Sequence, residues 1–148
     1  MEKNHLFIVL ADDDFDDRLF FTDAFSELKI ATKIHTCNDG AALMEYLQND
    51  ENLLPDILFL DLNMPKKNGL ECLKEIKANT KFQSIAIAIY STSSSEEHIE
   101  ETFVLGANVY IKKPADFNEL KSVLNEVVTR NWQYQTSGLN KENFLLRL

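Results

Sequence analysis

Five short apolar runs alternate along this chain with five segments whose apolar residues recur every three or four positions. This alternation is the strongest constraint on the fold, because strands that alternate with helices form a parallel sheet covered by helices on both faces. Three runs are almost continuously apolar, as in central strands, whereas the second is more polar and is expected at an edge. We predict strands over 5–11, 33–37, 56–60, 85–90 and 108–112, and helices over 16–28, 41–49, 70–78, 96–105 and 116–130.

The length of the chain predicts a single domain. Its 148 residues, of which 45% are hydrophobic, can build one core but leave no room for a second catalytic domain. The strand and helix pattern ends near residue 131, so we predict one domain over 1–131. The segment 132–148 is first polar and then apolar, and its role is not predicted.

The charge of the chain excludes several partners. Asp and Glu number 24 against 15 Lys and Arg, which gives a net charge of -9 and argues against direct binding to nucleic acid or to an anionic membrane. No apolar stretch approaches the roughly 20 residues of a membrane span, and no signal peptide is evident. We therefore expect a cytoplasmic protein, in which Cys37 and Cys72 are reduced thiols in or near the core.

Reactive side chains follow four of the predicted strands. Asp12–Asp14 follow the first strand, Asp61 the third, Ser91 the fourth and Lys113 the fifth. In an open parallel sheet, ligands bind beyond the carboxyl ends of the strands. These carboxylates, the hydroxyl and the ammonium are therefore expected to converge at one edge of the sheet.

Each of these residues also has an ordinary structural explanation. Asp12–Asp14 could cap a helix, Ser91 could do the same, and Lys113 could be a solvated charge. Their occurrence together at four strand ends favours a functional site, because clustered carboxylates destabilise a fold unless a cation lies among them. A small set of oxygen ligands suits Mg²⁺ better than calcium, zinc or a redox metal.

The order and spacing of these residues resemble the receiver domains of two-component signalling, from about Leu6 to Arg130. The resemblance implies a flavodoxin-like, doubly wound (βα)5 sandwich whose five parallel strands have the order 2-1-3-4-5. Part of it is similar to stand-alone response regulators found beside phytochrome-type sensor kinases. The matching residues are Asp12-Asp13, Leu60-Asp61-Leu62-Asn63-Met64-Pro65, Ser91, Gly106-Ala107, Tyr110 and Lys113-Pro114.

The resemblance implies that Asp61 accepts a phosphoryl group from a sensor histidine kinase or a histidine phosphotransfer protein. Asp13 and Asp61 would then bind Mg²⁺ directly, Asp12 through water, and Asn63 through its backbone carbonyl. A protein of this kind catalyses only its own phosphorylation and dephosphorylation. Output would pass to a downstream protein partner or along a phosphorelay.

The resemblance also implies the parts of a switch. Lys113 would pair with the phosphoryl oxygens, and the bond from Lys113 to Pro114 is expected to be cis. Ser91 would bind a phosphoryl oxygen and leave space into which Tyr110 swings from outside. The readout surface, which could also form a homodimer, would then be the helix 96–105, the strand 108–112 and the helix 116–130, with Ile99 and Tyr110 as apolar contacts.

Two further positions are expected to tune how long the phosphoryl group lasts. Asn63 can hold a water molecule, and Ser93 is too short to shield the phosphorus, so hydrolysis should be fast. A small aspartyl-phosphate hydrolase remains the alternative, although such an enzyme would want an acid or base at Asn63. A flavin-binding protein is disfavoured because Asp12–Asp14 would repel the flavin phosphate. A degenerate receiver is also disfavoured, since every expected site residue is present.

Overall fold

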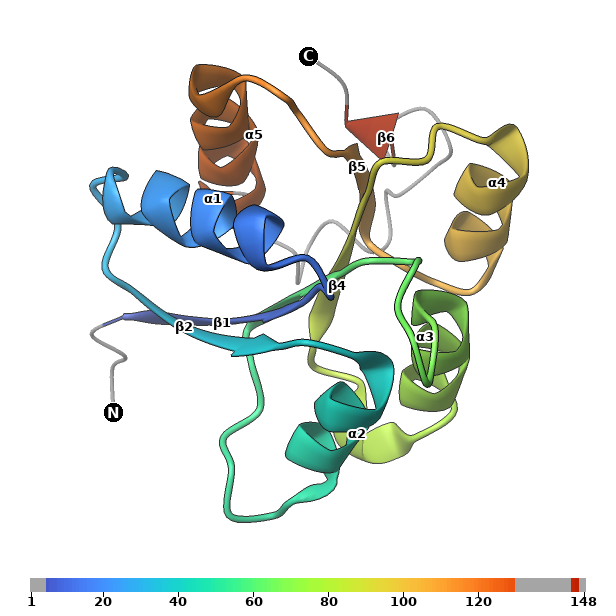
Figure 1. Ribbon diagram of the computed structural model, residues 1–148. Helices are drawn as coiled ribbons and strands as arrows, with labels where there is room; N and C mark the ends of the chain where they lie inside the picture. Colours follow the sequence, from blue (N-terminus) through green and yellow to red (C-terminus); the bar gives the residue numbers. More distant parts are fainter. Residues whose placement is uncertain (1–4, 130–144, 147–148) are drawn as a thin grey trace.

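The computed structural model describes residues 5–129 and 145–146, and the protein forms one parallel sheet with helices on both faces (Figure 1). The strands follow the order β2-β1-β3-β4-β5-β6, and every pair of neighbours is parallel. The strands are β1 (Leu6–Ala11), β2 (Thr32–Cys37), β3 (Ile57–Leu60), β4 (Ala86–Ser91), β5 (Val109–Lys112) and β6 (Leu145–Leu146).

Five α-helices connect and cover the strands. They are α1 (Phe15–Ser26), α2 (Gly40–Gln48), α3 (Gly69–Lys77), α4 (Glu96–Val104) and α5 (Phe117–Thr129), with a short 3₁₀ helix at Thr80–Phe82. Helices α1 and α5 lie on one side of the sheet, and α2, α3 and α4 lie on the other (Figure 1). In the part of the chain that the structure describes, no helix is both long and apolar enough to cross a membrane.

The alternation of side chains along each strand divides the apolar core into two layers. On β1, Ile8 and Leu10 pack beneath α1 and α5, whereas Phe7 and Val9 pack beneath the other three helices. Aromatic rings fill the α1 side, where Phe21 meets Phe59 edge to face at a centroid distance of 5.0 Å. Both faces of the central strands are therefore buried, as their nearly continuous apolar sequence predicts.

Side-chain caps start four of the helices at the carboxyl edge of the sheet or in the loops near it. Asp14 accepts a hydrogen bond from the backbone of Asp17, and Asp39 does the same for Ala42. Helix α3 begins with a capping box formed by Asn68 and Glu71, and α4 begins with Ser95 as its cap. These caps satisfy backbone N–H groups that helix formation leaves without partners.

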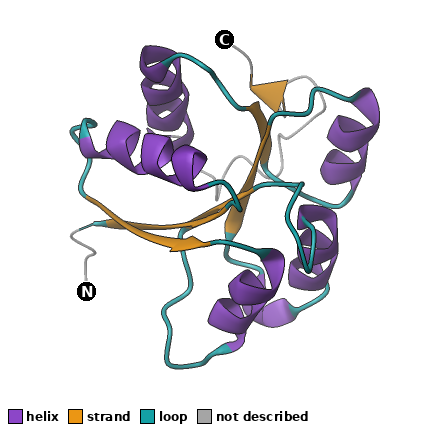
Figure 2. Cartoon of the chain, in the orientation of Figure 1, coloured by secondary structure: helices purple, strands orange, loops and turns teal. Residues whose placement is uncertain are grey.

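The flavodoxin-like fold predicted from the sequence is confirmed, with the five main strands in the order 2-1-3-4-5. The structure adds β6, which pairs with β5 through Tyr110 opposite Leu145 and Ile111 opposite Leu146 (Figure 2). The sheet therefore has six strands where five were expected, because a piece of the tail supplies backbone partners to the edge of β5. The remainder of the predicted tail, 132–144 and 147–148, lies outside the described residues.

One local expectation is wrong. The peptide bond from Lys113 to Pro114 is trans, as is every peptide bond of the described residues. The trans isomer is intrinsically favoured by about 0.5–1 kcal/mol even before proline.

Two buried thiols agree with the prediction of reduced core cysteines. Cys37 and Cys72 are both free and buried. Burial raises the pKa of Cys37 to about 11 and that of Cys72 to about 12. Both thiols are therefore protonated at neutral pH and serve as apolar packing.

Close backbone contacts fix where α3 begins relative to β3. A Cβ atom on Gly69 would lie 2.2 Å from the carbonyl oxygen of Asp61, and the N–H of Gly69 donates to the carbonyl of Leu62 at 3.0 Å. Only glycine allows the start of α3 to approach the end of β3 so closely. This contact holds the residues that follow β3 in place.

We predict that Gly69→Ala lowers the free energy of unfolding by about 2 kcal/mol or more, because a methyl group has no space against rigid backbone. Urea unfolding followed by circular dichroism measures the change. Lys74→Ala, an exposed substitution on the same helix, is the control and should change stability little. Equal stability of the two variants would contradict the proposed role of this close contact.

Candidate functional site

Three carboxylates meet at the carboxyl edge of the sheet. Asp12 and Asp13 follow β1, and Asp61 follows β3, the strand that pairs with β1. One oxygen from each of the three lies within 4.8 Å of the others. Asp12 is fully buried and Asp61 is 4% exposed, whereas Asp13 is open to solvent. The sequence prediction that these residues converge is confirmed.

Backbone hydrogen bonds orient the two buried carboxylates. The N–H of Asp61 donates to the carbonyl of Ala11 at 3.0 Å and so continues the ladder between β3 and β1. Oδ1 of Asp12 accepts from the N–H of Asp14 at 3.0 Å, and Oδ1 of Asp61 accepts from the N–H of Asn63 at 3.2 Å. Each carboxylate therefore has one oxygen held by the loop after its strand, and its second oxygen, Oδ2, faces the ammonium of Lys113.

The ammonium of Lys113 faces these oxygens from the end of β5. Its Nζ donates hydrogen bonds to Oδ2 of Asp61 at 3.1 Å and to Oδ2 of Asp17 at 2.8 Å. Nζ also lies 2.8 Å from Oδ2 of Asp12, as an ion pair, and 5.3 Å from the ring centroid of Tyr90. The Lys113 side chain is only 8% exposed, so water screens these interactions weakly.

The pKa values of Asp12 and Lys113 are both raised, but for different reasons. Burial raises the pKa of Asp12 to about 6, although Lys113 and the N–H of Asp14 act against this rise. Burial by itself would lower the pKa of Lys113, but the carboxylates of Asp12, Asp17 and Asp61 outweigh it and raise that pKa above its usual value. Lys113 is therefore charged at neutral pH, and burial makes Asp12 harder to ionise than an ordinary aspartate.

The carboxylates fit a divalent cation. Oδ2 of Asp12 is buried and accepts no hydrogen bond from any described residue, and its approach to Lys113 lacks hydrogen-bond geometry. Buried carboxylates that lie close together are costly, and a metal ion bound beside Asp12 would add to the positive charge that Lys113 supplies. The ligand set is made of oxygen atoms alone, which suits a hard cation.

The predicted switch residues lie between β4, β5 and α4. Ser91 is fully buried, and its Oγ accepts from the N–H of Ser93 at 3.1 Å. Tyr110 is also fully buried, and its hydroxyl donates to the carbonyl of Ser93 at 2.8 Å. Ser91 and Tyr110 are thus connected through one residue, Ser93.

Two expectations about this region are corrected. Tyr110 was expected to start outside the domain, but its ring belongs to the core beneath α4, where the Ser93 carbonyl satisfies its hydroxyl. Ile99 was expected on the surface of the same helix, but it is 3% exposed and packs inward. The helical period turns the glutamates of α4 outward and Ile99 toward the sheet.

Sequence reasoning missed three residues around the site. Asp17 reaches Lys113 from the first turn of α1, and Arg18 Nη1 donates to the carbonyl of Asp12 at 2.8 Å. His98 lies 2.9 Å from Oγ of Ser93 through its Nδ1. Asp17 lies in the first turn of α1, and no local pattern in the sequence indicated its contact with Lys113.

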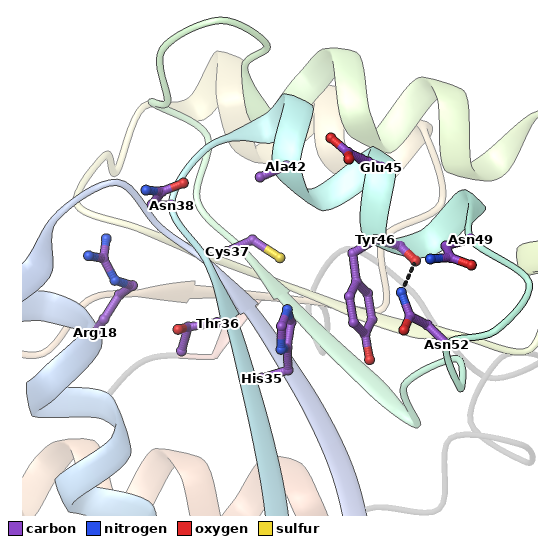
Figure 3. A pocket seen from close by; sticks show the side chains of 10 residues that line it. All are labelled: Arg18, His35, Thr36, Cys37, Asn38, Ala42, Glu45, Tyr46, Asn49 and Asn52. Carbon is purple, nitrogen blue, oxygen red and sulfur yellow. Dashed lines mark hydrogen bonds between the residues drawn. The ribbon is translucent and has the colours of Figure 1, made fainter.

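A solvent-filled hollow of about 460 Å³ opens beside the carboxylates, lined by Asp13, Asn63, Met64, Pro65 and His98 among others. A second hollow of about 530 Å³ lies away from them, between β2 and α2 (Figure 3). There the His35 ring stacks on Tyr46 at 4.2 Å, and the Asn52 amide donates to the Tyr46 carbonyl. Of these two hollows, only the first is lined by a carboxylate of the site and would give a substrate access to it.

Comparison with known proteins agrees with this geometry. The family described as response regulator receiver domain matches residues 8–125, which include every strand from β3 to β5 and every carboxylate of the site. The chain belongs to the response regulator receiver domain family. This receiver domain therefore shares its fold with response regulators.

The receiver domain is similar to regulators from archaea and cyanobacteria. It is 30% identical over 123 residues to the probable methanogenesis regulatory protein FilR2 of Methanothrix harundinacea, covering 81% of this chain and 79% of FilR2. It is 30% identical over 117 residues to the response regulator Rcp1 of Synechocystis, covering 76% and 80%.

Solved structures give the same result. The phosphorylated cyanobacterial phytochrome response regulator RcpA matches with a TM-score of 0.77 and 31% identity, covering 83% of this chain and 91% of RcpA. The Mn²⁺-bound form of Rcp1 matches with a TM-score of 0.76 and 28% identity, covering 82% and 91%. Similarity to phytochrome-associated regulators, expected from the motif around Asp61, is confirmed.

We predict that Lys113→Ala in this receiver domain lowers the free energy of unfolding by about 3 kcal/mol at pH 8, because it leaves buried carboxylates without a countercharge. The loss should be smaller at pH 5, where Asp12, whose pKa is already about 6, takes up a proton. Urea unfolding at the two pH values measures this difference. Lys112→Ala removes an exposed neighbouring charge and is the control; a pH-independent loss in Lys113→Ala would contradict the assigned role.

Proposed function

We propose that this response regulator accepts a phosphoryl group on Asp61 in a Mg²⁺-dependent reaction and signals by changing its protein contacts. The donor is a phosphohistidine on a sensor histidine kinase or a phosphotransfer protein. One observation carries the proposal: Asp61 lies at the end of a buried strand, within 4.8 Å of the Asp12 and Asp13 oxygens and 3.1 Å from Nζ of Lys113. Nucleophile and positive charge are thus already in position.

The transfer needs little covalent work from the protein. A carboxylate oxygen of Asp61 attacks the phosphorus in line, the bond from phosphorus to the histidine nitrogen breaks, and the electron pair stays on the imidazole, which takes up a proton from water. The aspartyl phosphate keeps the phosphoryl group. Lys113 is held beside the acceptor by Asp17 and Asp61, so its charge would already lie next to the attacking oxygen.

The metal ion belongs among the same carboxylates. Asp12, Asp13 and Asp61 would hold it together with the backbone carbonyl of Asn63. When bound, Mg²⁺ supplies positive charge that offsets the charge on the phosphoryl oxygens. The Mn²⁺-bound form of Rcp1 is a similar protein that binds a divalent cation and supports this assignment.

Hydrogen bonds connect Ser91 through Ser93 to residues of β5 and α4, and a structural change could follow them. A phosphoryl oxygen on Asp61 would accept a hydrogen bond from the Ser91 hydroxyl and draw Oγ toward it, away from the N–H of Ser93 that donates to this oxygen. Movement of Ser93 would then disturb its carbonyl, which Tyr110 holds, and its hydroxyl, which contacts His98 on α4. The phosphoryl group thereby changes the surface of α4 and β5.

The alternative function, an aspartyl-phosphate hydrolase that acts on an external substrate, is disfavoured. Asn63, the position at which an aspartyl-phosphate hydrolase would want an acid or base, is exposed and carries an amide that cannot transfer protons. Asn63 and Ser93 instead flank the approach of water and would set the lifetime of the phosphoryl group. Partner binding or homodimer formation is proposed on the face of α4, β5 and α5, where β6 would adjoin any partner.

We predict that acetyl phosphate and Mg²⁺ add one phosphoryl group to the protein, and that Asp61→Asn abolishes this addition because it removes the nucleophile. Intact-mass spectrometry measures the adduct. Asp14→Asn is the matched control, since Asn keeps the helix cap while removing a neighbouring charge. An adduct of equal amount on Asp61→Asn would place the acceptor elsewhere.

We further predict that Mg²⁺ raises the temperature of unfolding through Asp13. At ten times its dissociation constant, a ligand that binds only the folded state adds about 1.4 kcal/mol, or about 5 °C for a domain of this size. The shift should be lost in Asp13→Asn and kept in Asp14→Asn, whose side chain lies outside the carboxylate group. Differential scanning calorimetry gives the shift, and a full response in Asp13→Asn would be inconsistent with the assigned ligand.

A further inference from the structure

Lys113 has a carboxylate partner that the metal site does not use. The oxygens that could surround a cation belong to Asp12, Asp13 and Asp61, and Asp17 is not among them. Yet Oδ2 of Asp17 accepts one of the two hydrogen bonds that Nζ of Lys113 donates, and at 2.8 Å it is shorter than the 3.1 Å bond to Asp61. The ammonium is therefore shared between the acceptor residue and the first turn of α1.

The position of Asp17 is well defined by its surroundings. Its N–H donates to Oδ1 of the cap residue Asp14 at 3.1 Å, which fixes its backbone in the first turn of α1. Its side chain is 37% exposed, so its carboxylate is partly hydrated, whereas Lys113 is 8% exposed. A carboxylate in the first helical turn is also stabilised by the helix dipole. Asp17 thus contacts Lys113 from a partly hydrated position outside the group of oxygens that could surround a cation.

A phosphoryl group on Asp61 changes the balance around the ammonium. On the proposed function, the cation neutralises Asp12 and Asp61, and the phosphoryl oxygens become new acceptors for Lys113. Among the described residues, Asp17 is then the one carboxylate contact of Lys113 outside the proposed metal ligands. It draws the ammonium toward α1 and offsets its charge, and both effects weaken the attraction between Lys113 and the phosphoryl oxygens.

We propose that Asp17 is a positioning residue that competes with the phosphoryl group on Asp61 for the ammonium of Lys113. In the unphosphorylated protein it holds Lys113 beside the acceptor. In the phosphorylated protein, the Lys113 ammonium gives up its hydrogen bond to Asp17 and turns to the phosphoryl group. The free energy lost with that bond lowers the stability of the phosphorylated state. This inference rests on the proposed function and adds a residue that sets how strongly the site retains its phosphoryl group.

Beryllofluoride binding tests the competition directly, because beryllofluoride forms a phosphoryl mimic on the acceptor carboxylate. Isothermal titration calorimetry in saturating Mg²⁺ should show that Asp17→Asn binds beryllofluoride about fivefold more tightly than wild type, the upper range for a partly exposed ion pair. Asp17→Glu keeps the charge and should bind nearly as wild type does. Asp16→Asn is the matched control, since it removes an exposed charge from the same helical turn.

A second measurement follows the ammonium itself. In the nuclear magnetic resonance spectrum of the Mg²⁺-bound protein, the Lys113 side-chain signal should shift in Asp17→Asn but not in Asp16→Asn. Addition of beryllofluoride should move the wild-type signal as well, as Lys113 leaves Asp17. A residue that only stabilised α1 would change the unfolding temperature without moving this signal.

The outcomes separate the two proposals. If wild type neither binds beryllofluoride nor forms the acetyl phosphate adduct, the proposed function fails and the inference fails with it. If wild type does both, equal beryllofluoride affinities in Asp17→Asn and Asp16→Asn overturn the inference alone. Weaker binding in Asp17→Asn also overturns it, because Asp17 would then assist the phosphoryl site and not compete with it.

Discussion

The structure depends on keeping three carboxylates together beside a single ammonium. Asp12, Asp13 and Asp61 bring oxygens within 4.8 Å of one another, and Lys113 is the cation that reaches the two buried members. Such a cluster opposes folding because buried like charges repel and lose hydration. The apolar sheet offsets this cost, since the core on its two faces holds β1, β3 and β5 in the register that places these residues side by side.

The same packed core surrounds the residues proposed to carry the signal. Ser91, Ser93 and Tyr110 form one hydrogen-bonded series from the end of β4 to β5, and all of it except part of Ser93 is buried. A closely packed core does not deform gradually, so a change at Ser91 must be accommodated by discrete movements of its neighbours. With β6 paired to β5, such movements reach the piece of the tail that the structure describes.

Much of this site could be predicted from strand ends alone, and the remainder could not. Asp12, Asp61 and Lys113 were placed correctly because residues that directly follow parallel strands share one edge of the sheet. Asp17 was missed because a carboxylate in a first helical turn has a sufficient local explanation as a partner of the helix dipole. Its bond to Lys113 joins residues 96 positions apart, and no sequence period reports such a contact.

The sequence by itself therefore determined the fold class, the order of the elements and the edge at which the reactive groups meet, because hydrophobic periodicity and strand ends are local properties. Tertiary structure alone decided that Tyr110 lies inside, that β6 pairs with β5 and that Lys113 divides its hydrogen bonds between Asp17 and Asp61. These outcomes depend on which buried acceptor and which backbone edge lie within reach. Which groups lie within reach is decided only when segments distant in sequence pack together.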